Sequence, residues 1–322
     1  MKKVFSGKIV ILGLVIAIPL VLILIAYLTA PEQMNADTVK ALFHQALVSS
    51  VIGWGGLLGM KAMTMDLAIG GKYIVSAVIG GNIAMSLGLG NWGALPVCIL
   101  VGILVGVIDG CLYRFLHLPS MVVSIAVTLI YEAISNLAPN GKAQMDLKNM
   151  IMMRGPWNWL IPLIAGIIIF LIYNKTAIGA HAKASGLNPK VAISKGINFY
   201  KTKQLCYLIG GAFIGLYAWI QLMRAGVVRG QSNLSSVPLG FDALMCGFIA
   251  MALASVVNEV IGVFIGAFLI KTLQYVLLIF GLDSEYQGIM VGVLILTFLA
   301  VSGNVTRFRE WLRRKQIRSA ES

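Results

Sequence analysis

The stretch Asn174–Lys203, NKTAIGAHAKASGLNPKVAISKGINFYKTK, carries six lysines and one histidine but no aspartate or glutamate. Long apolar runs flank it, at Trp157–Tyr173 before the stretch and at Gln204–Met223 after it. A basic, acid-free segment between two hydrophobic spans is typical of a cytoplasmic loop, because positively charged loops are retained on that side of the membrane. The stretch therefore predicts a membrane protein that crosses the bilayer several times.

The middle of this stretch, Ala184–Gly196, has the small residues and the apolar spacing of a short amphipathic helix. Gly186 and Gly196 bracket it. We expect this helix to lie on the cytoplasmic face, where a partner protein pushes on it. The rest of the chain would then be a conduit that the push opens and closes.

The composition supports the membrane class. Of the 322 residues, 59% are hydrophobic and 11% are charged, whereas soluble domains carry about 25% charged residues. The formal net charge of +13 does not indicate a nucleic-acid partner, because the basic residues are spread over loops and do not form one stripe with interleaved aromatic residues.

A helix needs about 20 mostly apolar residues to cross the hydrocarbon layer, and the sequence contains about ten such segments. They lie near residues 9–28, 42–60, 66–88, 94–113, 119–138, 157–173, 204–223, 241–257, 260–280 and 286–303. The first segment has no small-residue cleavage site after it, so we expect a retained span. The predicted fold class is all-α and polytopic, with residues 1–322 forming a single transmembrane domain.

The loop charges predict the orientation. With a cytoplasmic N-terminus, the inner segments hold 17 basic residues and the outer segments hold six. The last inner segment is a basic C-terminal tail at 304–322. This bias places both termini in the cytoplasm, and an odd number of spans would destroy it.

Glycines recur at four-residue steps within the spans, which lets helix backbones approach closely in lipid. We expect these positions to pack helices tightly, within the subunit or across a dimer. They are Gly102, Gly106, Gly110, Gly211, Gly215, Gly262 and Gly266.

Motifs for catalysis and nucleotide binding are absent from the sequence. Gly88–Gly93 matches G-x-G-x-x-G, but no strand precedes it, and no G-x-x-x-x-G-K-[ST] loop exists. The four cysteines lie singly in apolar stretches, and the chain has only three histidines. We therefore expect no enzyme activity, no metal and no cofactor in this chain.

Charged residues inside spans are costly in lipid and face a pore, a partner or an interface by default. The residues in question are Asp66, Lys72, Asp109, Glu132, Asp242, Glu259 and Lys271. A proton or ion relay is one interpretation. Helix capping, snorkelling or an ion pair between subunits is the favoured one, and Asp66 has the place of a helix N-cap.

Three stretches carry a resemblance to a known family: Met65-Asp66-Leu67-Ala68-Ile69-Gly70, Ala184-x-Gly186-x-Asn188 followed by Ser194–Asn198, and Gly262-Val-Phe-Ile-Gly266-Ala267. In this order they resemble the permease subunits of the bacterial ABC importers of ribose, galactose and xylose. The similarity runs from about Ala41 to Ser302. It implies the inner (plasma) membrane of a bacterium.

The resemblance implies a permease dimer that binds two ATPase subunits inside and one substrate-binding protein outside, with ATP bound only by the ATPases. Residues 174–203 would be the segment that couples to the ATPase. The matching coupling residues are Ala184, Gly186, Asn188, Ala192, Ser194, Lys195 and Gly196. Polar residues within spans are the candidates for the translocation path: Asp66, Asn82, Thr128 and Asn136.

Two departures from the family pattern predict a divergent copy. Residues Ile249–Glu259 lack the glycine-dense run of the family, and the coupling segment has Pro189 and Val191 where the family favours an acid and a small residue. One hypothesis is that this chain pairs with a more typical sister permease instead of with itself.

The function predicted from sequence is the permease subunit of an ATP-driven importer for a small polar solute, with a monosaccharide favoured. An importer of nucleosides or another polar metabolite is the first alternative. An ion-coupled carrier that works without ATP or partners is the second. A gene neighbourhood with an ATPase and a secreted binding protein would separate these classes.

Overall fold

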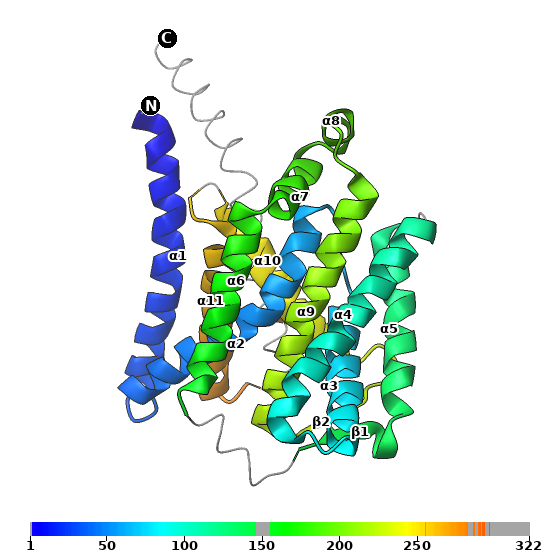
Figure 1. The fold of residues 1–322 in the computed structure, drawn as a ribbon. Helices are drawn as coiled ribbons and strands as arrows, with labels where there is room; N and C mark the ends of the chain where they lie inside the picture. Colours follow the sequence, from blue (N-terminus) through cyan, green and yellow to red (C-terminus); the bar gives the residue numbers. More distant parts are fainter. Residues whose placement is uncertain are drawn as a thin grey trace. The chain divides into compact units, whose positions relative to one another are not determined.

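The structure is a computed structural model that describes residues 2–116, 118–145, 155–254 and 256–282, with a few single positions up to residue 296. The helices are α1 (Lys2–Thr29), α2 (Ala36–Lys61), α3 (Ile69–Ser86), α4 (Gly90–Leu116), α5 (Ser120–Asn136), α6 (Trp157–Lys175), α7 (Ala177–Leu187), α8 (Pro189–Ser194), α9 (Phe199–Ala225), α10 (Val237–Leu253) and α11 (Glu259–Ile279) (Figure 1). A single turn of 3₁₀-helix, η1, covers Pro139–Gly141.

Two short strands complete the described elements. Strand β1 (Lys142–Gln144) pairs antiparallel with β2 (Val227–Arg229), and Lys142 lies opposite Arg229. The predicted all-α polytopic fold is confirmed, because α2, α4, α6, α9 and α11 are long and apolar enough to cross a membrane. Helices α5 and α10 and the part Ala17–Thr29 of α1 are shorter apolar helices.

Nine of the ten predicted spans coincide with α1–α6 and α9–α11, with boundaries that differ by at most seven residues. Most of the tenth span, 286–303, and the whole tail at 304–322 lie outside the described residues.

The chain divides into two compact units, one of residues 1–46 with 248–322 and one of residues 47–247. In the first unit α1 packs on α11, and Ala26, Met34, Leu42 and Val276 form a buried cluster. The centres of the Phe43 and Phe268 rings lie 4.5 Å apart. In the same unit Gly262 lies against the backbone of Ala250, so α11 approaches the end of α10 closely.

In the second unit the main helix pair is α4 with α9, which lie side by side (Figure 1). Their glycines face each other. A side chain on Gly102 would collide with the backbone of Gly211 and Gly215, and one on Gly106 with the backbone of Tyr207. The two backbones therefore touch along this seam, as small residues allow.

Helix α3 begins partway along its neighbours. Residues 62–68, after α2, are not helical. Gly71, in the first turn of α3, lies against Thr128 and Tyr131, which are well inside α5. Gly70 lies against the backbone of Ser236, just before α10. The first turns of α3 and α10 therefore meet beside the middle of α5.

Substituting Gly211 with valine tests the seam between α4 and α9. A Cβ at this position meets the carbonyl oxygen of Gly102, which is backbone and cannot move aside. We expect Gly211→Val to destabilise the protein by about 1–3 kcal/mol or more, as overpacking does. The measurement is the thermal unfolding midpoint of the purified protein in detergent.

The matched control is Gly13→Val in α1, where nothing lies within 4 Å of an added Cβ. This variant should unfold at the wild-type temperature. An equal loss of stability in both variants would contradict close backbone contact as the cause.

Candidate functional site

A buried charge cluster lies where α3 begins. The Nζ atom of Lys72 is 2.5 Å from Oδ2 of Asp66 and 2.6 Å from Oδ2 of Asp109. The Lys72 side chain is 1% exposed and that of Asp109 is 2% exposed. A charge in such a place is retained only when it is paired and hydrogen-bonded. The lysine therefore connects the segment before α3, α3 itself and α4.

Further hydrogen bonds fix each carboxylate of this cluster. Oδ1 of Asp66 accepts a hydrogen bond from the backbone N–H of Ala68 at 2.9 Å. The Tyr131 hydroxyl of α5 donates to Oδ1 of Asp109 at 2.5 Å. The sequence predicted Asp66 as a helix N-cap. In the structure Ala68 is the N-cap residue of α3, and Asp66, two residues before it, accepts the N–H of Ala68.

Aromatic rings close the other side of the cluster. The Lys72 Nζ atom lies 4.7 Å from the centre of the Tyr207 ring, which stacks on Tyr113 at a centroid distance of 4.7 Å. The adjoining cavity, bordered by Asp66, Lys72 and Tyr207, has a volume of about 10 Å³. That is about the space of one water molecule, so the cluster holds no solute in this conformation.

A second buried carboxylate, that of Glu132, stabilises the turn that precedes α10. Oε2 and Oε1 of Glu132 accept hydrogen bonds from the backbone N–H groups of Leu234 and Ser236, each at 2.8 Å. Asn233 and Leu234 have φ angles of 56° and 63°, a left-handed conformation that costs most residues about 1–2 kcal/mol. The buried Glu132 side chain therefore stabilises the turn at residues 233–236, whose backbone is strained.

Four residues were predicted from sequence for the translocation path. The side chains of three of them donate hydrogen bonds to backbone carbonyl groups. The Asn82 Nδ2 donates to the carbonyl oxygens of Val78 and Lys142, each at 2.8 Å. The Thr128 hydroxyl donates to its own helix, and the Asn136 Nδ2 donates to the Gln231 carbonyl. The fourth, Asp66, belongs to the charge cluster. Their role in a path stays a prediction.

The basic segment forms two short helices, α7 and α8 (Figure 1). The single helix expected over Ala184–Gly196 is wrong, because Asn188 interrupts it with an extended backbone and caps α8 by accepting the N–H of Val191 at 3.2 Å. Gly196, with a φ angle of 83°, ends the turn after α8. Asn198 then caps α9.

Helix α7 is tied to the end of α2. A Cβ on Gly186 would collide with the carbonyl oxygen of Lys61, the last residue of α2. The Nζ atom of Lys183 lies 3.8 Å from the centre of the Tyr173 ring in α6. Partial burial, with a smaller contribution from the nearby charge of Lys61, lowers the pKa of Lys183.

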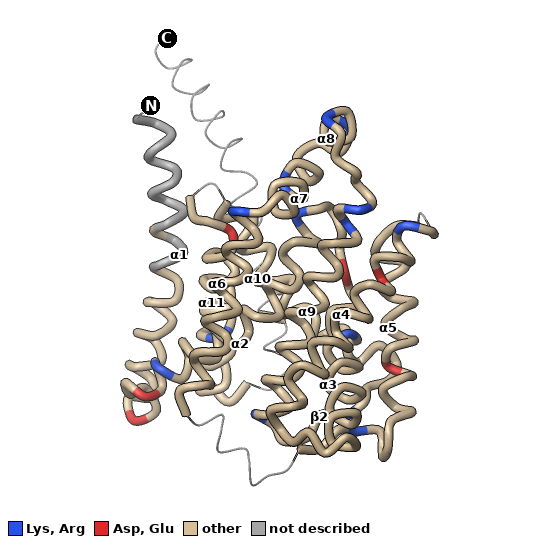
Figure 2. Tube along the Cα trace, in the orientation of Figure 1, with Lys and Arg blue, Asp and Glu red and all other residues tan. Residues whose placement is uncertain are grey.

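The outer surface of α7 and α8 is both basic and apolar. Figure 2 shows basic residues gathered at this end of the second unit, on α7, on α8 and at the start of α9. Between them Leu187 is 85% exposed, Val191 is 52% exposed and Ile193 is 55% exposed. We call these three residues, exposed within seven consecutive positions of the chain, the apolar patch. Of the predicted coupling residues, Ser194 and Lys195 are also exposed, whereas Ala184 is half-buried and Ala192 is buried.

The part of the chain that the structure describes contains no group of three His, Cys, Asp or Glu side chains arranged to hold a metal ion.

The sequence identified Asp66, Lys72 and Asp109 one by one as charged residues within spans, but it did not predict that they pair within the subunit. Lys72 and Asp109 lie on different helices, so no sequence spacing links them. The apolar patch was also missed, although its apolar residues beside lysines are visible in the sequence.

Together these features define a multi-pass helical membrane protein with an exposed basic segment between two spans. The chain belongs to the family described as the permease component of branched-chain amino acid transport systems, whose model matches residues 38–299. It is the permease subunit of an ABC importer and a protein of the inner membrane. The resemblance drawn from the sequence is confirmed at this level.

Several curated proteins are similar over most of their length. The autoinducer 2 import system permease protein LsrC of Yersinia enterocolitica is 24% identical over 279 residues, which cover 84% of this chain and 76% of that protein. The LsrC proteins of Yersinia pestis and Yersinia pseudotuberculosis are 23% identical, over 84% of this chain and 78% of theirs. No solved structure matches the chain.

Removing the lysine of the charge cluster tests its structural role. Lys72→Met leaves two buried carboxylates without their counter-charge, so we expect a loss of about 3–5 kcal/mol, as for other broken buried ion pairs. The measurement is the thermal unfolding midpoint in detergent, together with the yield of inserted protein.

The compensated control is Lys72→Met combined with Asp66→Asn and Asp109→Asn, which removes all three charges at once. This variant should recover much of the lost stability, because neutral side chains avoid the cost of unpaired charge. A triple variant that is less stable than Lys72→Met would contradict the argument.

Proposed function

We propose that this chain is the permease of an importer driven by separate ATPase subunits, which dock on α7 and α8. The apolar patch is the observation that carries the proposal. Leu187, Val191 and Ile193 stand exposed on a segment that carries six lysines and no acidic residue. Exposed apolar groups rimmed by polar ones mark a surface for another protein. The lysines around the patch favour a partner surface with acidic residues.

The proposed orientation places α7, α8 and both termini in the cytoplasm. The support is the distribution of basic residues, 17 in the inner segments against six in the outer ones. The ends of the second unit that carry β1, β2 and residues 230–236 would then face outward. A substrate-binding protein would deliver the solute there, and a second permease, either another copy or a sister chain, would complete the path.

The proposed solute is small and polar, with a monosaccharide favoured by the motif resemblance. The family is described for branched-chain amino acids, and the LsrC relatives are named for import of autoinducer 2. Uptake should therefore be compared for ribose, galactose, xylose, autoinducer 2, leucine and a nucleoside. Uptake of leucine alone would overturn the assignment to a monosaccharide.

A matched pair of leucines tests docking on the apolar patch. Leu187 at the end of α7 and Leu137 just after α5 are each 85% exposed, and they lie at opposite ends of the second unit. We expect Leu187→Asp to lose the ATPase subunit on purification, with at least a tenfold drop in its recovery. The cause is the loss of apolar contact at the centre of an interface. Leu137→Asp should keep the ATPase at the wild-type level.

The same preparations separate the alternative functions when they are reconstituted in liposomes. An ATP-driven importer takes up solute only with its ATPase, its binding protein and ATP, and Leu187→Asp should abolish that uptake. Uptake that an ion gradient drives through the permease alone would show a secondary carrier. Full ATPase recovery with Leu187→Asp would show that the patch is not the docking surface.

A further inference from the structure

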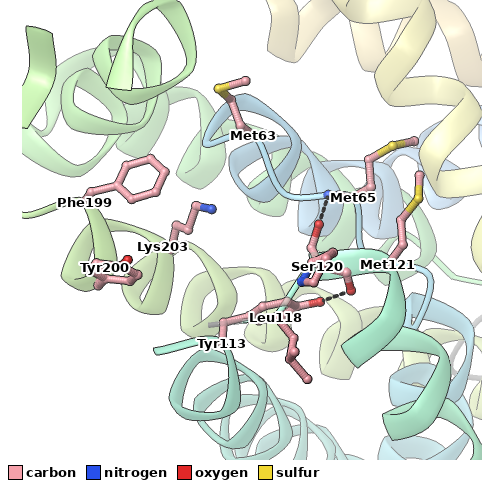
Figure 3. Close-up of a pocket in the computed structure, with 10 residues that line it drawn as sticks. Met63, Met65, Tyr113, Leu118, Ser120, Met121, Phe199, Tyr200 and Lys203 are labelled. Carbon is pink, nitrogen blue, oxygen red and sulfur yellow. Dashed lines mark hydrogen bonds between the residues drawn. The ribbon is translucent and has the colours of Figure 1, made fainter. Parts of the chain in front are cut away.

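A pocket, whose lining residues Figure 3 shows, opens beside the start of α9. In Figure 1 the start of α9 lies at the same end of the second unit as α7 and α8. The volume of the pocket is about 450 Å³. The walls come from the segment between α2 and α3, from the turn between α4 and α5, and from the first turn of α9. This size lies in the range of small-molecule sites, about 300–1,000 Å³.

The walls of the pocket are largely apolar and partly exposed. Met63 is 57% exposed, Leu118 is 50% exposed and Met121 is 45% exposed, while Tyr200 at the rim is 44% exposed. Unbranched methionine side chains adapt to flexible apolar chains. An aromatic rim beside an apolar wall is typical of the depth where lipid headgroups meet acyl chains.

Internal hydrogen bonds already hold the polar groups of the wall. The Tyr113 hydroxyl donates to the Ser120 carbonyl oxygen at 2.6 Å, and the backbone N–H of Met65 donates to the Ser120 hydroxyl at 3.3 Å (Figure 3). These bonds tie α4, α5 and the segment before α3 together around the pocket. The hydrogen bonds between these elements therefore fix the shape of the pocket. The surface that its walls leave for a ligand is mainly apolar.

The charge in the pocket is positive. Lys203 extends from α9 into the space among the other side chains (Figure 3), with its Nζ atom 4.3 Å from the centre of the Phe199 ring. None of the ten lining residues is acidic. Arg114 lies nearby, its Nη1 atom 3.5 Å from Oε1 of Gln204. The sequence contains no aspartate or glutamate from residue 147 to residue 241.

We propose that this pocket binds an anionic glycerophospholipid. Its phosphate would lie on Lys203, and an acyl chain would run along Met65, Leu118 and Met121. Basic pockets between membrane helices bind such headgroups, and a lysine near the surface contributes enough to change the affinity about fivefold. The inference rests on the proposed function only in placing this end of the helices at a membrane–water interface.

A lipid titration tests the proposal. The full chain, purified in detergent with its co-purifying subunits, is titrated with phosphatidylglycerol or phosphatidylcholine and followed by native mass spectrometry. We expect wild type to retain phosphatidylglycerol at least fivefold more tightly than phosphatidylcholine. Lys203→Gln should lower the affinity for phosphatidylglycerol about fivefold. Met121→Trp, which narrows the pocket without changing charge, should also lower it.

The matched control is Lys40→Gln, which removes an exposed lysine of α2 that lies outside both the pocket and the predicted coupling segment. It should bind phosphatidylglycerol like wild type, and all variants should share the wild-type unfolding midpoint. Equal binding of the two lipids, or unchanged binding in Lys203→Gln, would overturn the proposal. Lower ATPase recovery in Lys203→Gln with unchanged lipid binding would overturn it too, by assigning the pocket to a protein interface. Because lipid binding requires no ATP, its failure is separable from failure of the ATP-driven function.

Discussion

The ion pairs of Lys72 with Asp66 and Asp109 constrain the rest of the second unit. A lysine that is 1% exposed cannot be left unpaired in an apolar interior. The pairing holds the non-helical segment 62–68 against α3 and α4. Through Tyr131 it also reaches α5. The position at which α3 begins, beside the middle of α5, follows from these contacts.

This constraint also links the basic segment to the interior of the unit. Helix α7 lies on the carbonyl group of Lys61 through Gly186, with no room for a side chain between them. Five residues after Lys61 the chain enters the charge cluster at Asp66. A displacement of α7 would therefore act on the first turn of α3 through the contact with Lys61 and the ion pair of Asp66 with Lys72. On that first turn Gly70 lies against the backbone that precedes α10.

Much of the fold could be predicted from sequence, because membrane spans depend on local composition and length. The spans at 119–138 and 157–173 match α5 and α6 within two residues at each end. The interruption at Asn188 was missed because the amphipathic spacing continues across it, while the capping side chain stops the helix. The pairing of Lys72 with Asp109 was missed because it joins two helices, and one sequence does not report contacts between them. The pocket around Lys203 could not be predicted from sequence, because its walls come from three segments that are distant in the chain.

The proposed function requires that the segment with α7 and α8 faces the cytoplasm, where an ATPase reaches it. The most direct measurement is labelling of Ser194→Cys with a membrane-impermeant maleimide, with Leu137→Cys as the matched position at the other end of the unit. We expect the Ser194→Cys thiol to react only in inverted vesicles and the Leu137→Cys thiol to react in intact cells. Labelling of Ser194→Cys in intact cells would contradict it.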